Sequence, residues 1–191
     1  MTILTPNVSK DSYALYDGFD TFSYNCISYL MKNDEMIWRL LFYNTPDAWD
    51  ETVIGKPNLT QEQKASLIYD GSDDSSKFHV FMDQGQPEAE TTEGAIIRIA
   101  PYSLNPDNRV VGTILMIFEA YTNYHVNHLS NYRTRNDMIA KRFLQVFNGA
   151  TIEGGLGKLH LDNLGSYGTR LELGGQTPFR GRWILMATKS D

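Results

Sequence analysis

The sequence predicts an α+β fold: a mostly antiparallel sheet with an amphipathic helix packed on one face, preceded by an N-terminal helical segment. Two apolar strand-like runs at 95–102 and 109–121, a well-capped helical pattern at 134–148, and near-helical apolar spacing at 20–44 support this prediction. With 191 residues and 41% hydrophobic content, we expect a single domain over 1–191. Within it, 20–44 is the leading helix, 45–93 an insertion or arm, and 94–188 the core of sheet and helix.

The leading segment is predicted to be helical, with Asp20 or Thr21 capping its start. Asn33 and Asp34 interrupt the apolar pattern, so one long helix and two consecutive helices are both compatible with it. Thr45-Pro46 ends the segment, because the residue before a proline disfavours helical geometry. Apolar side chains recur through it at Phe22, Cys26, Ile27, Leu30, Ile37 and Leu41, which places the single cysteine in the core.

The 45–93 segment is predicted to contain a loop, a short helix and a strand. The helix begins after Thr60, where Gln63 completes a capping box, and it ends at Asp70-Gly71 with Leu67 and Ile68 on its apolar face. The alternation over 77–83 predicts a strand, and 84–93 is predicted to be an exposed loop.

The strands at 95–102 and 109–121 are predicted to form an antiparallel hairpin across a turn at 105–108. The second strand is apolar on both faces, with Ile114, Met116 and Phe118 on one side and Val111, Leu115 and Ile117 on the other. Both faces therefore need a cover. Helices of this chain would cover one face, and a loop, an extra strand layer or a neighbouring subunit would cover the other.

The helix over 134–148 is predicted to start at a Thr134 cap and to end at Gly149. Its apolar stripe contains Ile139, Phe143, Val146 and Phe147. Short strands are predicted after it, at 158–162, 169–173 and 182–188, separated by glycine-rich turns.

Catalytic motifs are not apparent, and we expect no enzyme activity, no cofactor and no metal. The one candidate metal site is His125-x-x-His128 joined by His160 and Asp162, since imidazoles and carboxylates are common metal ligands. The two spaced histidines lie in a loop between a strand and a helix. Histidines of an exposed loop or of a subunit contact are therefore the preferred interpretation.

The formal charge of −6 argues against a general affinity for duplex DNA. Neither a signal peptide nor a membrane-spanning run is evident, so we expect a soluble protein in a reducing compartment. The aromatic share of 12% is compatible with a tyrosine-rich core and with extensive subunit contacts. The residues we expect at a subunit or partner interface are Arg170, Arg180, Arg182, Trp183, Tyr121 and Tyr124.

The order of the predicted elements and the late aromatic run Pro178–Leu185 after a glycine-rich hairpin resemble small neck proteins of tailed bacteriophages. The tail-terminator and tail-completion proteins are the most similar group, with head-closure and head–tail joining proteins nearby. The resemblance covers 94–188 and 20–44, whereas 49–93 is longer than the usual connection between the first helix and the sheet.

The resemblance implies a homo-oligomeric ring, commonly a hexamer, at the head–tail junction of the virion. Such a ring terminates the tail tube, joins it to head-completion proteins, and lets DNA pass through its lumen without sequence-specific binding or membrane contact. Assembly would occur in the host cytoplasm. The alternatives are a head-closure or adaptor ring of the neck, a dimeric adaptor unrelated to phage, or a metal-dependent or small-ligand-binding α+β enzyme.

Overall fold

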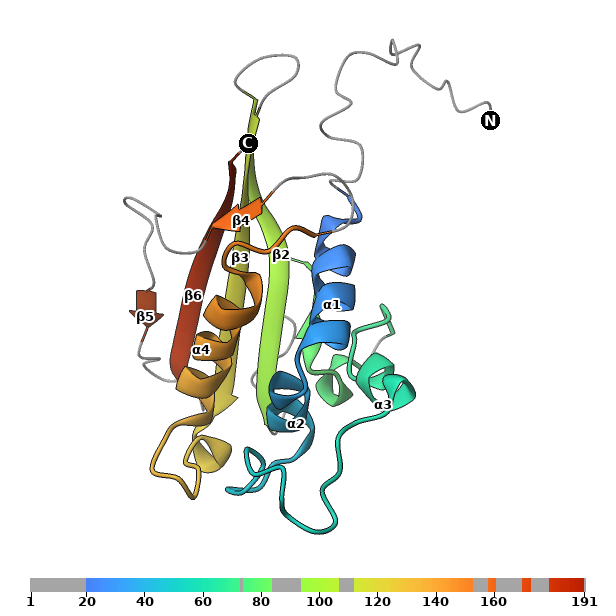
Figure 1. Cartoon of the computed structure of the whole chain (residues 1–191), viewed down its shortest axis with the longest axis vertical. Coiled ribbons are helices and arrows are strands. Elements are labelled where there is room, and N and C mark those ends of the chain that lie inside the picture. Colours follow the sequence, from blue (N-terminus) through green and yellow to red (C-terminus); the bar gives the residue numbers. More distant parts are fainter. Residues whose placement is uncertain are drawn as a thin grey trace.

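Strands from distant parts of the chain join into one mixed sheet. The computed structural model describes residues 20–72, 74–83, 94–106, 112–152, 158–160, 170–172 and 179–190. Within these residues the six-stranded sheet has the order β1-β2-β3-β6-β4, and β5 also pairs with β6 (Figure 1). The strands are β1 (Val80–Phe81), β2 (Ala95–Pro106), β3 (Gly112–Asn123), β4 (Lys158–His160), β5 (Arg170–Glu172) and β6 (Phe179–Ser190). The helices are α1 (Phe22–Asn33), α2 (Met36–Phe42), α3 (Gln61–Ser66) and α4 (Arg135–Phe147), with 3₁₀ turns η2 (Ser75–Lys77) and η3 (Tyr124–Val126).

The predicted hairpin is confirmed as the antiparallel pair β2 and β3. β2 is longer than predicted at the hairpin end, so Asn105 and Pro106 belong to β2 and pair with β3, not to the turn. β3 begins at Gly112 and extends two residues farther than predicted at its other end, to Asn123. A register shift between Pro101 and Ser103 marks a bulge in β2. The sheet is mostly antiparallel, as expected, and its one parallel pair joins β1 to β2.

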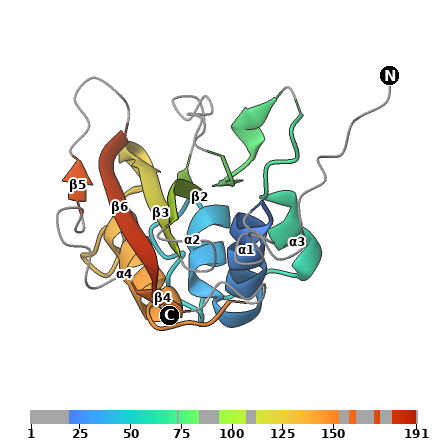
Figure 2. The ribbon, with the colours of Figure 1, turned by 90° about the horizontal axis from the view of Figure 1, so that it is seen from above.

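Helices α1, α2 and α4 lie across one face of the sheet (Figures 1 and 2). The leading segment is two helices, because Asp34 interrupts the pattern: its side chain accepts a hydrogen bond from Ile37 N at 2.7 Å. Thr21 occupies the N-cap position of α1 without a side-chain capping bond, so that predicted cap is wrong. The α4 cap is confirmed, with Asp137 N donating to Thr134 Oγ1 at 3.2 Å. Gly149 follows in the left-handed conformation that the sequence predicts.

The core lies between this face and the helices. Ile114, Met116 and Phe118 point into it, and Phe118 packs on Phe143 and Phe147 of α4. Cys26 is fully buried in the same cluster, and burial raises the pKa of its thiol far above the usual value. These contacts confirm the helical stripe predicted for 134–148.

Two of the three apolar residues predicted on the second face of β3 are buried within the single chain, and the third, Val111, lies outside the described residues. Leu115 and Ile117 of β3 each expose only 7% of their surface. Beside them, Arg98 and Glu119 pair across β2 and β3, and the Tyr121 hydroxyl lies 3.1 Å from Arg98 Nη2. A neighbouring subunit is therefore not needed to bury these two apolar residues.

Parts of the 45–93 segment belong to the core: Ala48, Leu59, Leu67 and Val80 are buried in it. The Thr60–Gln63 capping box is confirmed. The helix ends at Ser66 instead of Asp70-Gly71, because Ile68 bridges to Val80 and Tyr69 N donates to Val80 O. The strand predicted over 77–83 is reduced to the two residues of β1, because the residues before them form η2 and a loop. Of the C-terminal strands, β4 and β5 are shorter than predicted, and β6 is longer.

Candidate protein-docking surface

Arg39 of α2 holds one loop from inside the protein. Its side chain is fully buried, and the guanidinium donates to the backbone carbonyls of Ala48 at 3.2 Å, Asp50 at 2.7 Å and Lys56. The Lys56 ammonium also pairs with the Asp47 carboxylate. A buried guanidinium needs several acceptors to offset its lost hydration. The loop therefore keeps the shape in which its carbonyl oxygens converge on Arg39.

Arg135 holds a second loop in the same way. It is fully buried at the first position of α4 and donates to Val126 O at 2.9 Å, Tyr43 O at 2.8 Å and Thr45 O at 2.9 Å, as well as to Leu40 O. Burial lowers the pKa of its guanidinium to about 10, so the group remains charged at neutral pH. One side chain thus ties the loop before α4 to the end of α2.

The two loops also bind each other. Trp49 Nε1 donates to Ser130 Oγ at 3.0 Å, and Ser130 N donates to Pro46 O at 2.8 Å. We call residues 45–57 and 124–134 together the loop platform. Figure 1 shows it at the lower end of the molecule, where the two loops extend beyond α2 and α4.

The loop platform presents apolar side chains to solvent although its backbone is fixed. Ile54 is 99% exposed and Tyr132 is fully exposed, and Tyr124 is also exposed. Tyr132 has a φ of 62°, a conformation that non-glycine residues adopt at an energetic cost. Large exposed apolar side chains on an ordered loop are typical of protein contact sites, where aromatic residues contribute most of the binding energy. This arrangement can bind a protein surface with little loss of loop entropy.

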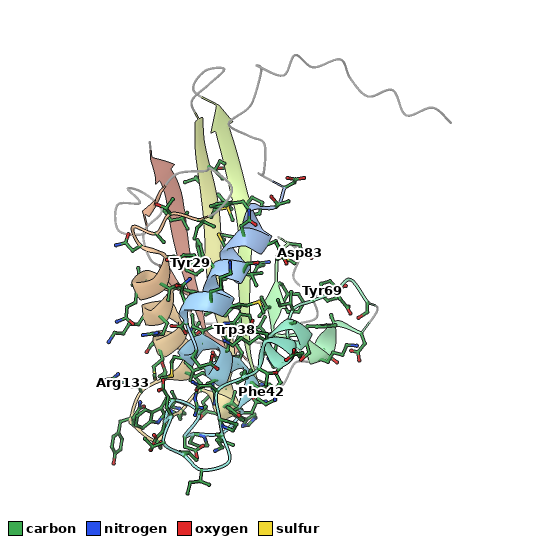
Figure 3. The ribbon with its side chains drawn as sticks, turned by 45° about the vertical axis from the view of Figure 1, so that its right-hand side comes forward. Tyr29, Trp38, Phe42, Tyr69, Asp83 and Arg133 are labelled. Carbon is green, nitrogen blue, oxygen red and sulfur yellow. The ribbon has the colours of Figure 1, made fainter. Side chains whose placement is uncertain are left out.

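A hollow of about 380 Å³ lies beside Tyr132, at the start of α4. The exposed Arg133 and Lys141 cations and the Asp137 carboxylate line this hollow. Figure 3 labels Arg133 on this side of the molecule, opposite the flank that carries Tyr69 and Asp83. The lining residues are Tyr132, Arg133, Thr134, Asp137, Met138 and Lys141.

The structure does not assemble the three candidate histidines. His125 and His128 are exposed on the loop platform, where their rings contact Tyr124. His160 pairs with Thr188 of β6, and Thr188 pairs with Leu115, eight positions before Asn123 on β3. At a strand rise of ~3.3 Å per residue, roughly 26 Å of sheet separates His160 from the loop platform. No group of three potential metal ligands occurs among the residues that the structure describes, and Asp162 lies outside them.

Five of the six residues predicted at an interface fall along neighbouring strands, and Tyr124 lies in η3. Arg182 pairs with Tyr121 on one side and Glu172 on the other, Trp183 pairs with Ala120 and Leu171, and Arg170 pairs with Ile184. Arg180 lies in β6 opposite the end of β3. Tyr121 is half-buried by Arg98, so only Tyr124 of the six is found exposed on the loop platform. The side chains of Arg170, Arg180, Arg182 and Trp183 lie outside the described part of the structure.

Sequence reasoning missed Arg39, Arg135, Ile54 and Tyr132. Two signals point to the arginines. Arg39 is a lone charge in the apolar run Ile37–Leu41, and Arg135 puts a cation at a helix N-terminus, where the helix dipole disfavours it. The exposure of Ile54 and Tyr132 has no comparable signal, because it depends on how distant parts of the chain pack.

Among the described residues, no helix has the length and apolar character needed to span a bilayer.

Comparison with known proteins gives one family. Neither a curated protein nor a solved structure matches the chain. A family model described as YomW matches residues 34–172, more than half of the chain, and this range includes both loops of the loop platform and the hollow. The chain therefore belongs to the YomW family, whose name is that of a phage-derived protein and points to a phage protein.

Proposed function

We propose that this protein is a non-enzymatic structural component of a phage virion, and that it forms a homo-oligomeric ring at the head–tail junction. In this function it terminates the tail tube and joins it to the head-completion proteins, and DNA passes through the lumen without sequence-specific contacts. Its place is the neck of the virion.

The loop platform is the observation that carries the proposal. Two buried arginines hold its loops, and the loops expose Ile54 and Tyr132. This arrangement favours work done by protein contacts. The phage-derived family name favours a virion as the setting. The acidic charge of −6 suits a conduit that does not retain passing DNA.

The test is the mass and shape of the purified protein, alone and with tail-tube and head-completion proteins of the same phage. Mass measurement and negative-stain imaging should show closed rings, and antibody labelling of virions should place the protein at the neck. A chain that stays monomeric at every concentration and with every one of these partners would contradict the proposal. So would labelling confined to the capsid shell or to the distal tail.

A further inference from the structure

We infer that copies of this chain bind each other through a knob and a socket on the loop platform: the loop around Ile54 of one copy enters the hollow beside Tyr132 of the next. This inference rests on the proposed function, because it names the contact by which the ring subunits assemble.

The knob is one side chain on a fixed turn. Ile54 is 99% exposed, and Gly55 follows it with a φ of +88°. Arg39 binds the carbonyl oxygens of Asp50 and Lys56 on either side of the turn. The exposed Glu51 carboxylate lies three residues before Ile54, and no described residue pairs with it. The knob is therefore an apolar tip with a negative charge beside it.

The socket has the matching character. Its walls include the Tyr132 ring and the half-buried Met138 side chain, which offer apolar contact. Arg133 and Lys141 on its rim are exposed, and no side chain in the described ranges forms an ion pair with either. The volume of about 380 Å³ accommodates a branched aliphatic side chain. An incoming Glu51 would meet two cations in surroundings that also contain the Asp137 carboxylate.

A second copy is the occupant that these observations favour, because both complementary parts belong to the same chain. A contact between two different patches repeats from copy to copy and closes into a ring when the rotation fits. The two patches lie on adjacent loops at one end of the molecule. Opposite charges at such a contact select the register and suppress wrong pairings.

Charge reversal tests the contact. The variants are Glu51→Lys, Lys141→Glu, the double variant, and an equimolar mixture of the two single variants, each followed by analytical ultracentrifugation at low salt. Glu62→Lys and Lys32→Glu serve as matched controls, because both reverse an exposed charge outside the loop platform. Circular dichroism checks that every variant is folded.

Each single reversal should weaken self-association roughly tenfold or more, because like charges then meet at the contact. The double variant and the mixture should recover association to within about threefold of the wild type, since each lysine again faces a glutamate. The controls should match the wild type. Loss of association in a single variant without recovery in the double variant or in the mixture would overturn the inference.

The outcomes separate this inference from the proposed function. Rings that form equally well in all variants overturn the knob-and-socket contact and leave the ring standing. Dimers that dissociate and recover with the charges support the contact and count against the ring. A wild-type chain that is monomeric at every concentration overturns the contact. If a small anion binds to the hollow of that monomer, Arg133 and Lys141 have another role, which is to bind that anion.

Discussion

At the scale of single residues, two buried arginines determine the shape of the loop platform. A guanidinium has five donors in a planar fork, so Arg39 can bind several carbonyl oxygens of one loop, and Arg135 can bind carbonyl oxygens from different parts of the chain. Backbone carbonyls at the end of α2 would otherwise be buried without donors. Arg39 thus satisfies carbonyls of the first loop, and Arg135 satisfies carbonyls of the second loop and of the end of α2 together.

Replacing Arg135 with methionine should lower the free energy of unfolding by about 3 kcal/mol or more, because carbonyl oxygens at four positions lose a charged donor. Urea denaturation of dilute protein measures the change. The neighbouring Arg133→Met variant removes an exposed guanidinium and should stay within about 0.5 kcal/mol of the wild type. Equal losses in the two variants would show that Arg135 is not the structural clamp described above.

At the scale of elements, the sequence pattern correctly predicted those features that depend on contacts between residues close together in the chain. The Thr134 cap and the apolar stripe of α4 depend on contacts within a few residues, and Asp34 interrupts the leading helix through its own bond to Ile37 N. The strand predicted at 77–83 is present only as the two residues of β1, because its extent is set by pairing with β2, and the sequence pattern did not indicate this partner. The Arg135 bonds to α2 join residues more than 90 positions apart, and no sequence window contains both partners.

Gly94, immediately before β2, makes a sharp test of close packing. Its φ is +141°, and a Cβ atom there would lie 2.9 Å from Asn44 Oδ1 and 3.0 Å from His79 Cε1. Burial lowers the pKa of His79, so its ring is neutral at this site near neutral pH. Gly94→Ala should lower the free energy of unfolding by about 2–4 kcal/mol through backbone strain and collision.

The control is Gly71→Ala, at a φ of +84° with no atom within 4 Å of the added Cβ. That variant carries only the backbone strain, of about 1 kcal/mol. Thermal and urea unfolding of both variants give the difference that belongs to the collision. A Gly94→Ala variant no less stable than Gly71→Ala would show that Asn44 and His79 move aside without cost.

At the scale of the whole molecule, stability and assembly should separate. Ile54 and Tyr132 are exposed in the single chain, so they contribute to binding and hardly to folding. If copies associate, the wild-type Tm should rise by roughly 5–10 °C at a concentration about 100-fold above the dissociation constant.

The double variant Ile54→Ser with Tyr132→Ser should keep the Tm of dilute wild-type protein and lose its dependence on concentration. Differential scanning calorimetry over a range of protein concentrations measures both properties. A variant whose Tm still rises with concentration as the wild type does would place the contact between copies elsewhere on the surface.

The edge of the sheet beside β1 bears on how copies can join. Only Ile97 and Arg98 of β2 pair with β1. Farther along β2, Pro101 lacks an N–H donor, and a bulge precedes Ser103. Short edge strands, prolines and bulges are the devices that keep sheets from adding strands of another molecule. Fibre-like stacking through backbone hydrogen bonds is therefore disfavoured at this edge. Copies would then join through side chains of the loops, and salt or a change of charge can release such a contact.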